Sequence, residues 1–129
     1  MNKRQRIFEK YNGLCAYSGT ALEPDWQVDH VNPIIRNKDG SCMFPNADKE
    51  DNMAPCQRVI NHYKGNWTLQ EFRSYMLTLH ERLAKLPVTP KVQKSIRRKE
   101  YMLKVAAYFD VTPENPWNGV FYFEKKEEK

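Results

Sequence analysis

The segment from residue 29 to residue 65 concentrates the side chains that could do hydrolytic chemistry. It contains the adjacent pair Asp29 and His30, the pair Asp51 and Asn52, and further on Asn61. An imidazole that is neutral near physiological pH is a suitable base for activating water, so His30 is the candidate base. A hard cation such as Mg²⁺ prefers oxygen ligands and keeps several waters, so one carboxylate and one amide oxygen can seat it. Asp29 and Asn61 supply these oxygens, which predicts metal-assisted hydrolysis.

The elements around these residues must meet two geometric conditions. Adjacent residues of a regular strand point to opposite faces, so Asp29 and His30 share a target only if the strand ends or distorts there. Neighbouring residues of a helix diverge by about 100°, so Asn61 and His62 cannot both face one metal. Lys64 follows Asn61 by three positions on the same helical face, where it could contact a phosphate.

Breakers and periodicity place these residues on elements. Residues 3–11 predict a short amphipathic helix, and residues 14–28 predict a turn-rich hairpin region with a strand at 26–28. The stretch 31–50 is long and irregular, with a tight turn expected at Asp39-Gly40. After Pro55 the pattern becomes helical and ends at Gly65.

The C-terminal half is predicted to be mostly helical. Thr68 and Glu71 form a capping box that opens a helix reaching Leu86, and a further helix is expected over residues 91–109. Residues 120–123 predict a short terminal strand, and residues 124–129 predict a solvated, flexible tail. The expected class is α+β.

Four stretches together resemble the HNH nuclease family. They are Gly13-Leu14-Cys15-Ala16-Tyr17-Ser18-Gly19, Val28-Asp29-His30-Val31-Asn32-Pro33, Asn52-Met53-Ala54-Pro55, and the run from Asn61 to Arg73. In that family a ββα-metal (His-Me) finger, made of two short strands and a helix around one divalent cation, cuts phosphodiesters. The resemblance implies a finger core at 13–66 and a helical extension at 67–110. The length of 129 residues predicts a single domain covering 1–129.

The same resemblance implies roles for the candidate residues. His30, Asn52 and Asn61 would be catalytic, with Asp29 and Asn61 holding Mg²⁺ or Mn²⁺ and Asn52 hydrogen-bonding His30 to fix its ring. Products with 5′-phosphate and 3′-hydroxyl ends would be expected. Many family members have a histidine at the third motif position, but the family's register falls on Asn61 and Lys64. The remaining two polar residues, which would support the site without touching the metal, are Asp51 and His62.

The cysteines bear on a zinc ribbon that many HNH proteins carry. Three cysteines without a signal peptide make a disulfide framework improbable and indicate a reducing, cytoplasmic setting. In the family two Cys-x-x-Cys pairs hold zinc, but here the first pair reads Cys15 to Ser18. Gln57 and Ile60 stand at the second pair's positions, and Cys56 is one residue out of register. We therefore expect no structural zinc, and we assign no role to Cys42.

Charge distribution bears on the partner. The chain has 129 residues, a net charge of +5, and basic clusters at residues 1–10 and 91–104. Its apolar runs are far shorter than a membrane span, so no membrane partner is expected. The clusters fit DNA, with RNA not excluded, although a merely solvated surface explains them equally well. The candidate nucleic-acid contacts are Lys64, Arg58, Arg73, Lys3, Arg4, Arg6, Lys94, Arg97 and Arg98.

Three functional readings stay open at this point. The leading one is a metal-dependent endonuclease acting on DNA. The second is a non-catalytic nucleic-acid-binding protein on the same scaffold. The third, a hydrolase of small phosphate esters, is disfavoured by the flanking basic clusters. Substrate form, sequence specificity, preferred metal and oligomeric state are left undetermined by these patterns.

Overall fold

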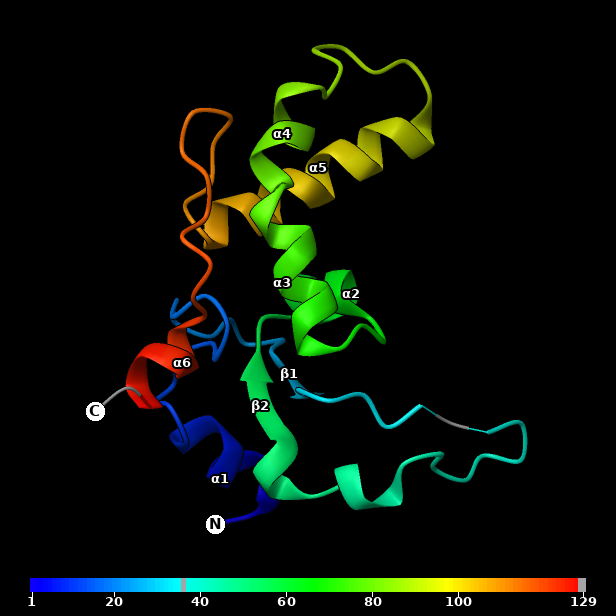
Figure 1. Cartoon of the computed structure of the whole chain (residues 1–129), viewed down its shortest axis with the longest axis vertical. Helices are drawn as coiled ribbons and strands as arrows, with labels where there is room; N and C mark the ends of the chain where they lie inside the picture. Colours follow the sequence, from blue (N-terminus) through cyan, green and yellow to red (C-terminus); the bar gives the residue numbers. More distant parts are fainter. Residues whose placement is uncertain (36, 128–129) are drawn as a thin grey trace. The chain divides into compact units, whose positions relative to one another are not determined.

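The computed structural model describes residues 1–35 and 37–127. Its elements are α1 (Lys3–Glu9), β1 (Gln27–His30), η1 (Pro45–Ala47), η2 (Glu50–Asn52), β2 (Met53–Cys56), α2 (Arg58–Lys64), α3 (Leu69–Leu77), α4 (Leu79–Ala84), α5 (Gln93–Tyr108) and α6 (Tyr122–Glu127) (Figure 1). Helices combined with an antiparallel sheet confirm the predicted α+β class. None of the helices in this part of the chain is long and apolar enough to cross a membrane.

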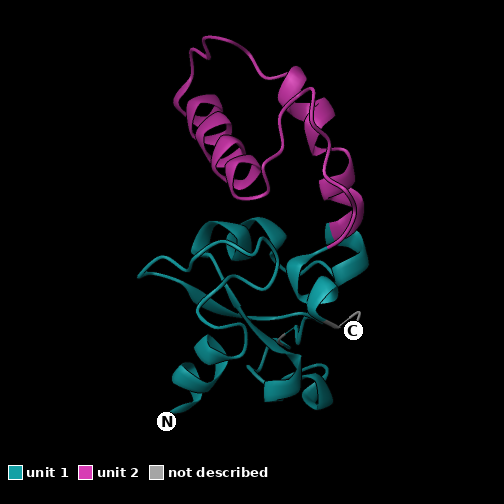
Figure 2. Cartoon of the chain, turned by 90° about the vertical axis from the view of Figure 1, so that its left-hand side faces the viewer, with its two compact units in different colours: residues 1–72, 121–129 teal, residues 73–120 magenta. Residues whose placement is uncertain are grey.

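The chain divides into two compact units (Figure 2). Unit 1 comprises residues 1–72 and returns at residue 121, and unit 2 comprises residues 73–120. The single domain predicted from the length stays a prediction, and the contacts within the chain cluster into these two compact units. The helical extension expected at 67–110 corresponds in part to unit 2, which begins in the middle of α3.

The sheet of unit 1 consists of β1 and β2 in antiparallel pairing. Gln27 lies opposite Cys56, and His30 lies opposite Met53. All four residues of β2 are buried. Helix α2 begins two residues after β2 and contacts β1, and it ends at Gly65 as predicted. The order strand, strand, helix therefore brings the end of β1 close to α2.

Aromatic rings build the core of unit 1. The rings of Tyr17 and Phe72 lie 5.6 Å apart and those of Tyr17 and Phe121 lie 5.4 Å apart, both edge to face. Phe72 and Phe121 stack at 5.3 Å. Both phenylalanines are fully buried. Phe121 thus joins the C-terminal segment to the core that precedes residue 73.

The terminal strand predicted at residues 120–123 is wrong. Helix α6 begins at Tyr122, and the backbone N–H of Lys125 bonds the carbonyl of Phe121 at 3.3 Å. The carboxylate of Glu124 accepts from the backbone N–H of Phe121 at 2.9 Å, which satisfies a donor of the first turn. This local cap overrides the strand propensity of the aromatic run. The expected flexible tail is helical at 124–127, and its last two residues lie outside the described part of the chain.

Unit 2 departs from the single helix predicted up to Leu86. The helix breaks at Thr78, between α3 and α4. The guanidinium of Arg82 donates to the hydroxyl of Thr78 and to the carbonyl of Tyr75, each at 2.5 Å. The bond to Tyr75 gives this backbone carbonyl at the break a side-chain partner. Helix α5 falls within the range predicted for it.

The N-terminal turns and the long loop follow a mixed pattern. The hairpin expected at 14–28 is reduced to an isolated bridge between Leu14 and Ala21, because β1 pairs with β2 instead. The tight turn at Asp39-Gly40 is present, with Gly40 at a φ of 90°. Behind the turn, the N–H of Met43 bonds the carbonyl of Ile35 at 2.8 Å.

Candidate functional site

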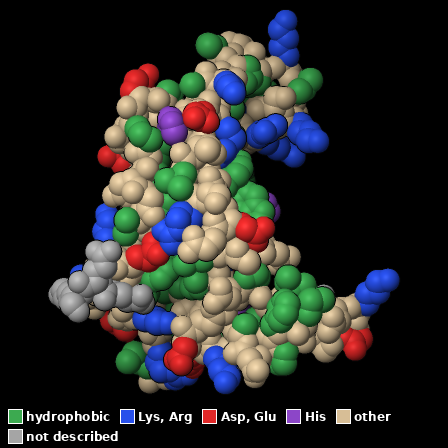
Figure 3. All heavy atoms as spheres, in the orientation of Figure 1, with side chains coloured by type: hydrophobic (Ala, Val, Ile, Leu, Met, Phe, Trp, Pro, Cys, Tyr) green, Lys and Arg blue, Asp and Glu red, His purple; other side chains and the backbone are tan. Residues whose placement is uncertain are grey.

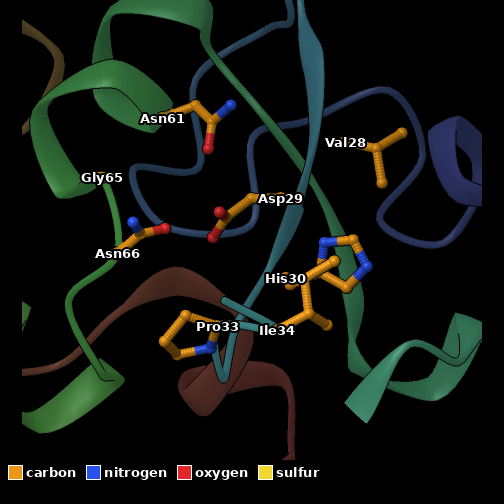
Figure 4. Close-up of a pocket in the computed structure, with 8 residues that line it drawn as sticks. All are labelled: Val28, Asp29, His30, Pro33, Ile34, Asn61, Gly65 and Asn66. Carbon is orange, nitrogen blue, oxygen red and sulfur yellow. The ribbon is translucent and has the colours of Figure 1, made fainter. Parts of the chain in front are cut away.

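A pocket of about 270 Å³ lies where β1 ends beside α2 (Figure 4). We call it the site pocket. Its lining residues are Val28, Asp29, His30, Pro33, Ile34, Asn61, Gly65 and Asn66. Three residues singled out from the sequence, Asp29, His30 and Asn61, thus line one cavity although they come from two elements.

Asp29 is a buried carboxylate held by two neighbours. Its Oδ2 atom lies 3.2 Å from the Nζ atom of Lys64, and the hydroxyl of Tyr17 donates to the same oxygen. Burial raises the pKa of Asp29, while the charge of Lys64 and the bond from Tyr17 act in the opposite direction. The ion pair compensates in part for removing the carboxylate from water.

Lys64 does not occupy the place predicted for it. Its side chain is fully buried, and its ammonium also donates to the carbonyl of His30 at 3.1 Å. The predicted phosphate contact at the surface is therefore wrong. The face of α2 that carries Lys64 packs onto β1, so the ammonium pairs with Asp29 rather than facing solvent.

The His30 ring is held by a residue that sequence reasoning missed. Its Nε2 atom lies 2.9 Å from Oδ1 of Asp48, and both side chains are partly exposed. The other carboxylate oxygen of Asp48 accepts from the Cys42 thiol at 3.9 Å, which gives Cys42 a place in the structure. An ionised carboxylate only accepts hydrogen bonds, so Nε2 carries the hydrogen and Nδ1 is left as the acceptor.

Asn52 does not make the predicted bond to His30. Its side-chain oxygen accepts from the backbone N–H of Asn32 at 2.9 Å. Its amide nitrogen donates to the carbonyls of Asn32 at 2.8 Å and Ala47 at 2.7 Å. Asn52 therefore fastens the two ends of the long loop that carries Asp48.

The strand distortion required at Asp29 and His30 is not observed. β1 runs through His30, which keeps its pairing with Met53. Figure 4 shows the two side chains leaving the strand on different sides. Both nevertheless line the site pocket. Residues 29 and 30 therefore both border the pocket, although their side chains leave β1 on different sides.

Asn61 and Asn66 direct amide groups into the site pocket. The Asn61 amide nitrogen donates to Oε1 of Gln27 at 2.7 Å, which assigns the opposite atom as oxygen. In Figure 4 the amide oxygens of Asn61 and Asn66 both point toward the Asp29 carboxylate. His62 is exposed on α2, and Asp51 is exposed in η2, outside the lining of the pocket. Asn66 is a residue that the sequence reasoning missed.

A hard divalent cation fits this donor set. One carboxylate and two amide oxygens converge, and Mg²⁺ retains waters for its remaining positions. Across residues 1–35 and 37–127 no group of three or more His, Cys, Asp or Glu side chains could hold a metal. A site that includes Asn61 uses amide oxygens and does not require such a group.

The predicted nucleic-acid contacts fall into two sets. Some make contacts within the chain: Arg4 stacks 3.8 Å over the Trp26 ring, and Arg6 pairs with Glu50 at 2.5 Å. Within unit 2, Arg73 donates to the carbonyl of Gly119 at 2.5 Å. The remaining ones are exposed and comprise Lys3, Arg58, Lys94, Arg97 and Arg98.

A glutamine braces the region in which the resemblance would have placed a zinc ribbon. Gln57 is buried, and its amide donates to Oγ1 of Thr20 at 3.1 Å and to the carbonyl of Ala21 at 2.8 Å. Its side-chain oxygen accepts from the N–H of Glu23 at 3.0 Å. One side chain thereby joins the turn at 20–23 to the segment between β2 and α2. The only sequence signal at Gln57 was its place at a position of the second Cys-x-x-Cys pair.

The two buried thiols lie beside this bracing. Cys15 and Cys56 are both free and buried. Burial acts to raise the pKa of Cys15, but hydrogen bonds from Cys56 and Ser18 outweigh it and bring the pKa to about 6. Burial raises the pKa of Cys56 well above its ordinary value. The lack of structural zinc stays a prediction.

Comparison with known proteins adds no relative: no family model matches the chain, and no curated protein matches it.

Proposed function

We propose that this chain is a metal-dependent endonuclease of the HNH type that hydrolyses phosphodiester bonds in DNA. The observation that carries the proposal is the convergence of Asp29, His30 and Asn61 on one pocket. The strand, strand, helix order of β1, β2 and α2 supports a ββα-metal finger as the scaffold.

His30 is the general base of the proposed reaction. Its hydrogen bond to Asp48 places the hydrogen on Nε2. Nδ1 then accepts a proton from the attacking water, and Asp48 stabilises the imidazolium that forms. The Asp48 contact also fixes the ring orientation, a requirement for efficient proton transfer.

Asp29, Asn61 and Asn66 would hold the cation, Mg²⁺ or Mn²⁺. When bound, the cation neutralises charge on the phosphate and on the leaving oxygen. Tyr17 and Lys64 occupy one oxygen of Asp29 from inside the fold. They keep the carboxylate in place and thereby orient its remaining oxygen.

Exposed cations supply the proposed DNA contacts. Lys3 and Arg58 lie on unit 1, and Lys94, Arg97 and Arg98 lie on unit 2. Contacts of this kind with phosphates carry no sequence information, so we expect low intrinsic sequence specificity.

A supercoiled plasmid tests the proposal. With Mg²⁺ or Mn²⁺ the wild-type chain relaxes the plasmid, and EDTA abolishes the relaxation. His30→Ala lowers the rate about 10²- to 10⁴-fold, the usual contribution of a general base. His62→Ala is the matched control, because this histidine is exposed outside the pocket; it leaves the rate unchanged.

Two outcomes would contradict the proposal. DNA binding without cutting across several divalent metals would favour the non-catalytic alternative. Loss of activity in His62→Ala but not in His30→Ala would show that His62, and not His30, takes part in the reaction.

A further inference from the structure

A second hollow of about 700 Å³ lies in unit 1 beside the site pocket. We call it the loop groove. It shares Pro33 and Asn66 with the site pocket. Further lining residues are Ile35, Phe44 and Asn46 from the long loop and Glu71 from α3. A substrate held in the site pocket therefore has this groove as its immediate neighbour.

The lining of the loop groove selects against phosphate. The described lining residues include the carboxylate of Glu71 and no lysine or arginine. Its surface is instead mainly apolar, with the half-exposed ring of Phe44 and the amide of Asn46 at hand. A flat, uncharged heteroaromatic ring with polar edges matches this combination.

The groove is formed before any ligand arrives. The two arms of the loop are paired, with the N–H of Phe44 bonding the carbonyl of Ile34 at 3.3 Å. Asn52 ties Asn32 to Ala47 at the base of the loop, and all three line the groove. Ile35 is held at a φ of 41°, a conformation that a β-branched residue rarely adopts.

We propose that the loop groove binds the nucleobase next to the scissile phosphate, with Phe44 as its stacking platform. This inference rests on the proposed endonuclease function and names its substrate form. In a duplex both faces of each base are covered by neighbours, and a base reaches the groove only after unstacking. Single-stranded DNA presents its bases without that cost, so it is the preferred substrate.

The hydrophobic surface of the loop supports this inference. Figure 3 shows hydrophobic side chains gathered on the part of unit 1 that the long loop occupies. Phe44 is 50% exposed and its neighbour Met43 is 49% exposed. Phe44 lines the groove and Met43 does not. The two residues thus form a matched pair for an experiment.

The first test compares cleavage of a single-stranded oligonucleotide with cleavage of its own duplex, in Mg²⁺ or Mn²⁺. Wild type cuts the single strand faster. Phe44→Ala loses about 10- to 100-fold of that rate, in line with the contribution of one stacked base. Phe44→Tyr retains the rate because it keeps the ring, and Met43→Ala retains it because this side chain lies outside the groove.

A second test measures binding and needs no catalysis. Fluorescence anisotropy in the presence of EDTA measures binding to a series of single-stranded oligonucleotides. Each member carries one abasic site, at a different position of the same sequence. For wild type at least one abasic position weakens binding, whereas Phe44→Ala binds every member of the series equally. Circular dichroism checks that each variant is folded.

The outcomes separate this inference from the endonuclease proposal. Equal rates on duplex and single strand, or equal losses in Phe44→Ala and Met43→Ala, overturn the groove assignment and leave the nuclease intact. If the chain cuts no form of DNA, the endonuclease proposal is overturned. The binding of the abasic oligonucleotides then tests by itself whether the loop groove holds a nucleobase. If no abasic position weakens binding to the wild-type chain, the groove assignment is overturned whether or not the chain cuts DNA.

Discussion

The buried carboxylate of Asp29 contacts two side chains, the buried ammonium of Lys64 and the phenol of Tyr17. The residue types were visible in the sequence at 17, 29 and 64, but their meeting was not. Strand alternation indicated that Asp29 and His30 diverge, and this holds in the structure. Helical spacing put Lys64 on the face of Asn61, yet it carried no information about which face packs inward. Contacts between distant segments, here α2 on β1, decide that point.

The titration of Asp29 gives a prediction for stability. Burial raises its pKa above the ordinary value of 3.8, against the pull of Lys64 and Tyr17. A raised pKa means that protonation stabilises the fold, fully below pH 3.8 and less as the pH rises through the folded-state pKa. Asp29→Asn does not titrate, so its stability relative to wild type improves as the pH rises from acidic to neutral.

Urea unfolding of both chains across that pH range measures this difference. The exposed exchange Asp25→Asn controls for the change in net charge. The prediction would be contradicted if the free energy of unfolding of wild type rose relative to that of Asp29→Asn as the pH increased. It would show that the ion pair with Lys64 outweighs the cost of burial.

At the scale of elements, the sequence correctly predicted the helix ends that neighbouring residues determine. The capping box of α3 is present, with the N–H of Thr68 bonding Glu71 at 2.9 Å and the N–H of Glu71 bonding Thr68 at 3.2 Å. Gly65 ends α2 for the same kind of local reason. The wrong predictions involve partners far away in the sequence: β1 pairs with β2 across a long loop instead of within the hairpin expected at 14–28, and α6, besides its local cap, bonds residues 16 and 17.

Asp48 and Gln57 illustrate why part of the site escaped prediction. Asp48 reaches His30 because the long loop folds back, and its sequence surroundings resemble those of an ordinary turn. Gln57 stands where the resemblance to HNH proteins would place a zinc ligand, and its three hydrogen bonds reach residues 20–23. Neither contact has a spacing that a pattern search could detect. Asp29, His30 and Asn61 could be singled out because their types and order resemble the HNH motif.

Removing the Gln57 amide should weaken unit 1. Gln57→Ala deletes three hydrogen bonds and leaves their backbone partners near Thr20 and Glu23 without them, at a cost of about 2–4 kcal/mol. Urea unfolding monitored by circular dichroism gives the change. Gln93→Ala, at the exposed start of α5, is the matched control and changes stability little.

Two results bear on the zinc question in the same experiment. Wild-type stability that does not respond to EDTA agrees with bracing by Gln57. A wild-type stability that falls with EDTA, is restored by Zn²⁺ but not by Mg²⁺, and is unchanged by Gln57→Ala would mean that zinc holds this region.

At the scale of the whole molecule, unit 1 is discontinuous along the chain. Its aromatic core takes Tyr17 and Phe72 from before unit 2 and Phe121 from after it. Unit 1 therefore depends on a residue far in sequence from the site pocket that it supports.

Phe121→Ala tests this dependence. Replacing this fully buried ring should cost about 3–5 kcal/mol, as large-to-small exchanges of buried aromatic residues do. Thermal unfolding provides the measurement, and Leu103→Ala, at an exposed apolar position of α5, provides the control. A loss no greater than that of the control would show that the C-terminal segment does not support the core.

The discontinuity also orders events during translation. Ribosomes deliver the chain from its N-terminus, so Asp29, His30 and Asn61 are synthesised long before Phe121. Between them the ribosome must complete all of unit 2. A nascent chain that stops at residue 72 has the site residues but lacks the ring that closes their core. For a protein proposed to cut nucleic acid, this sequence order leaves the core of the unit that carries the site incomplete until synthesis has passed residue 121.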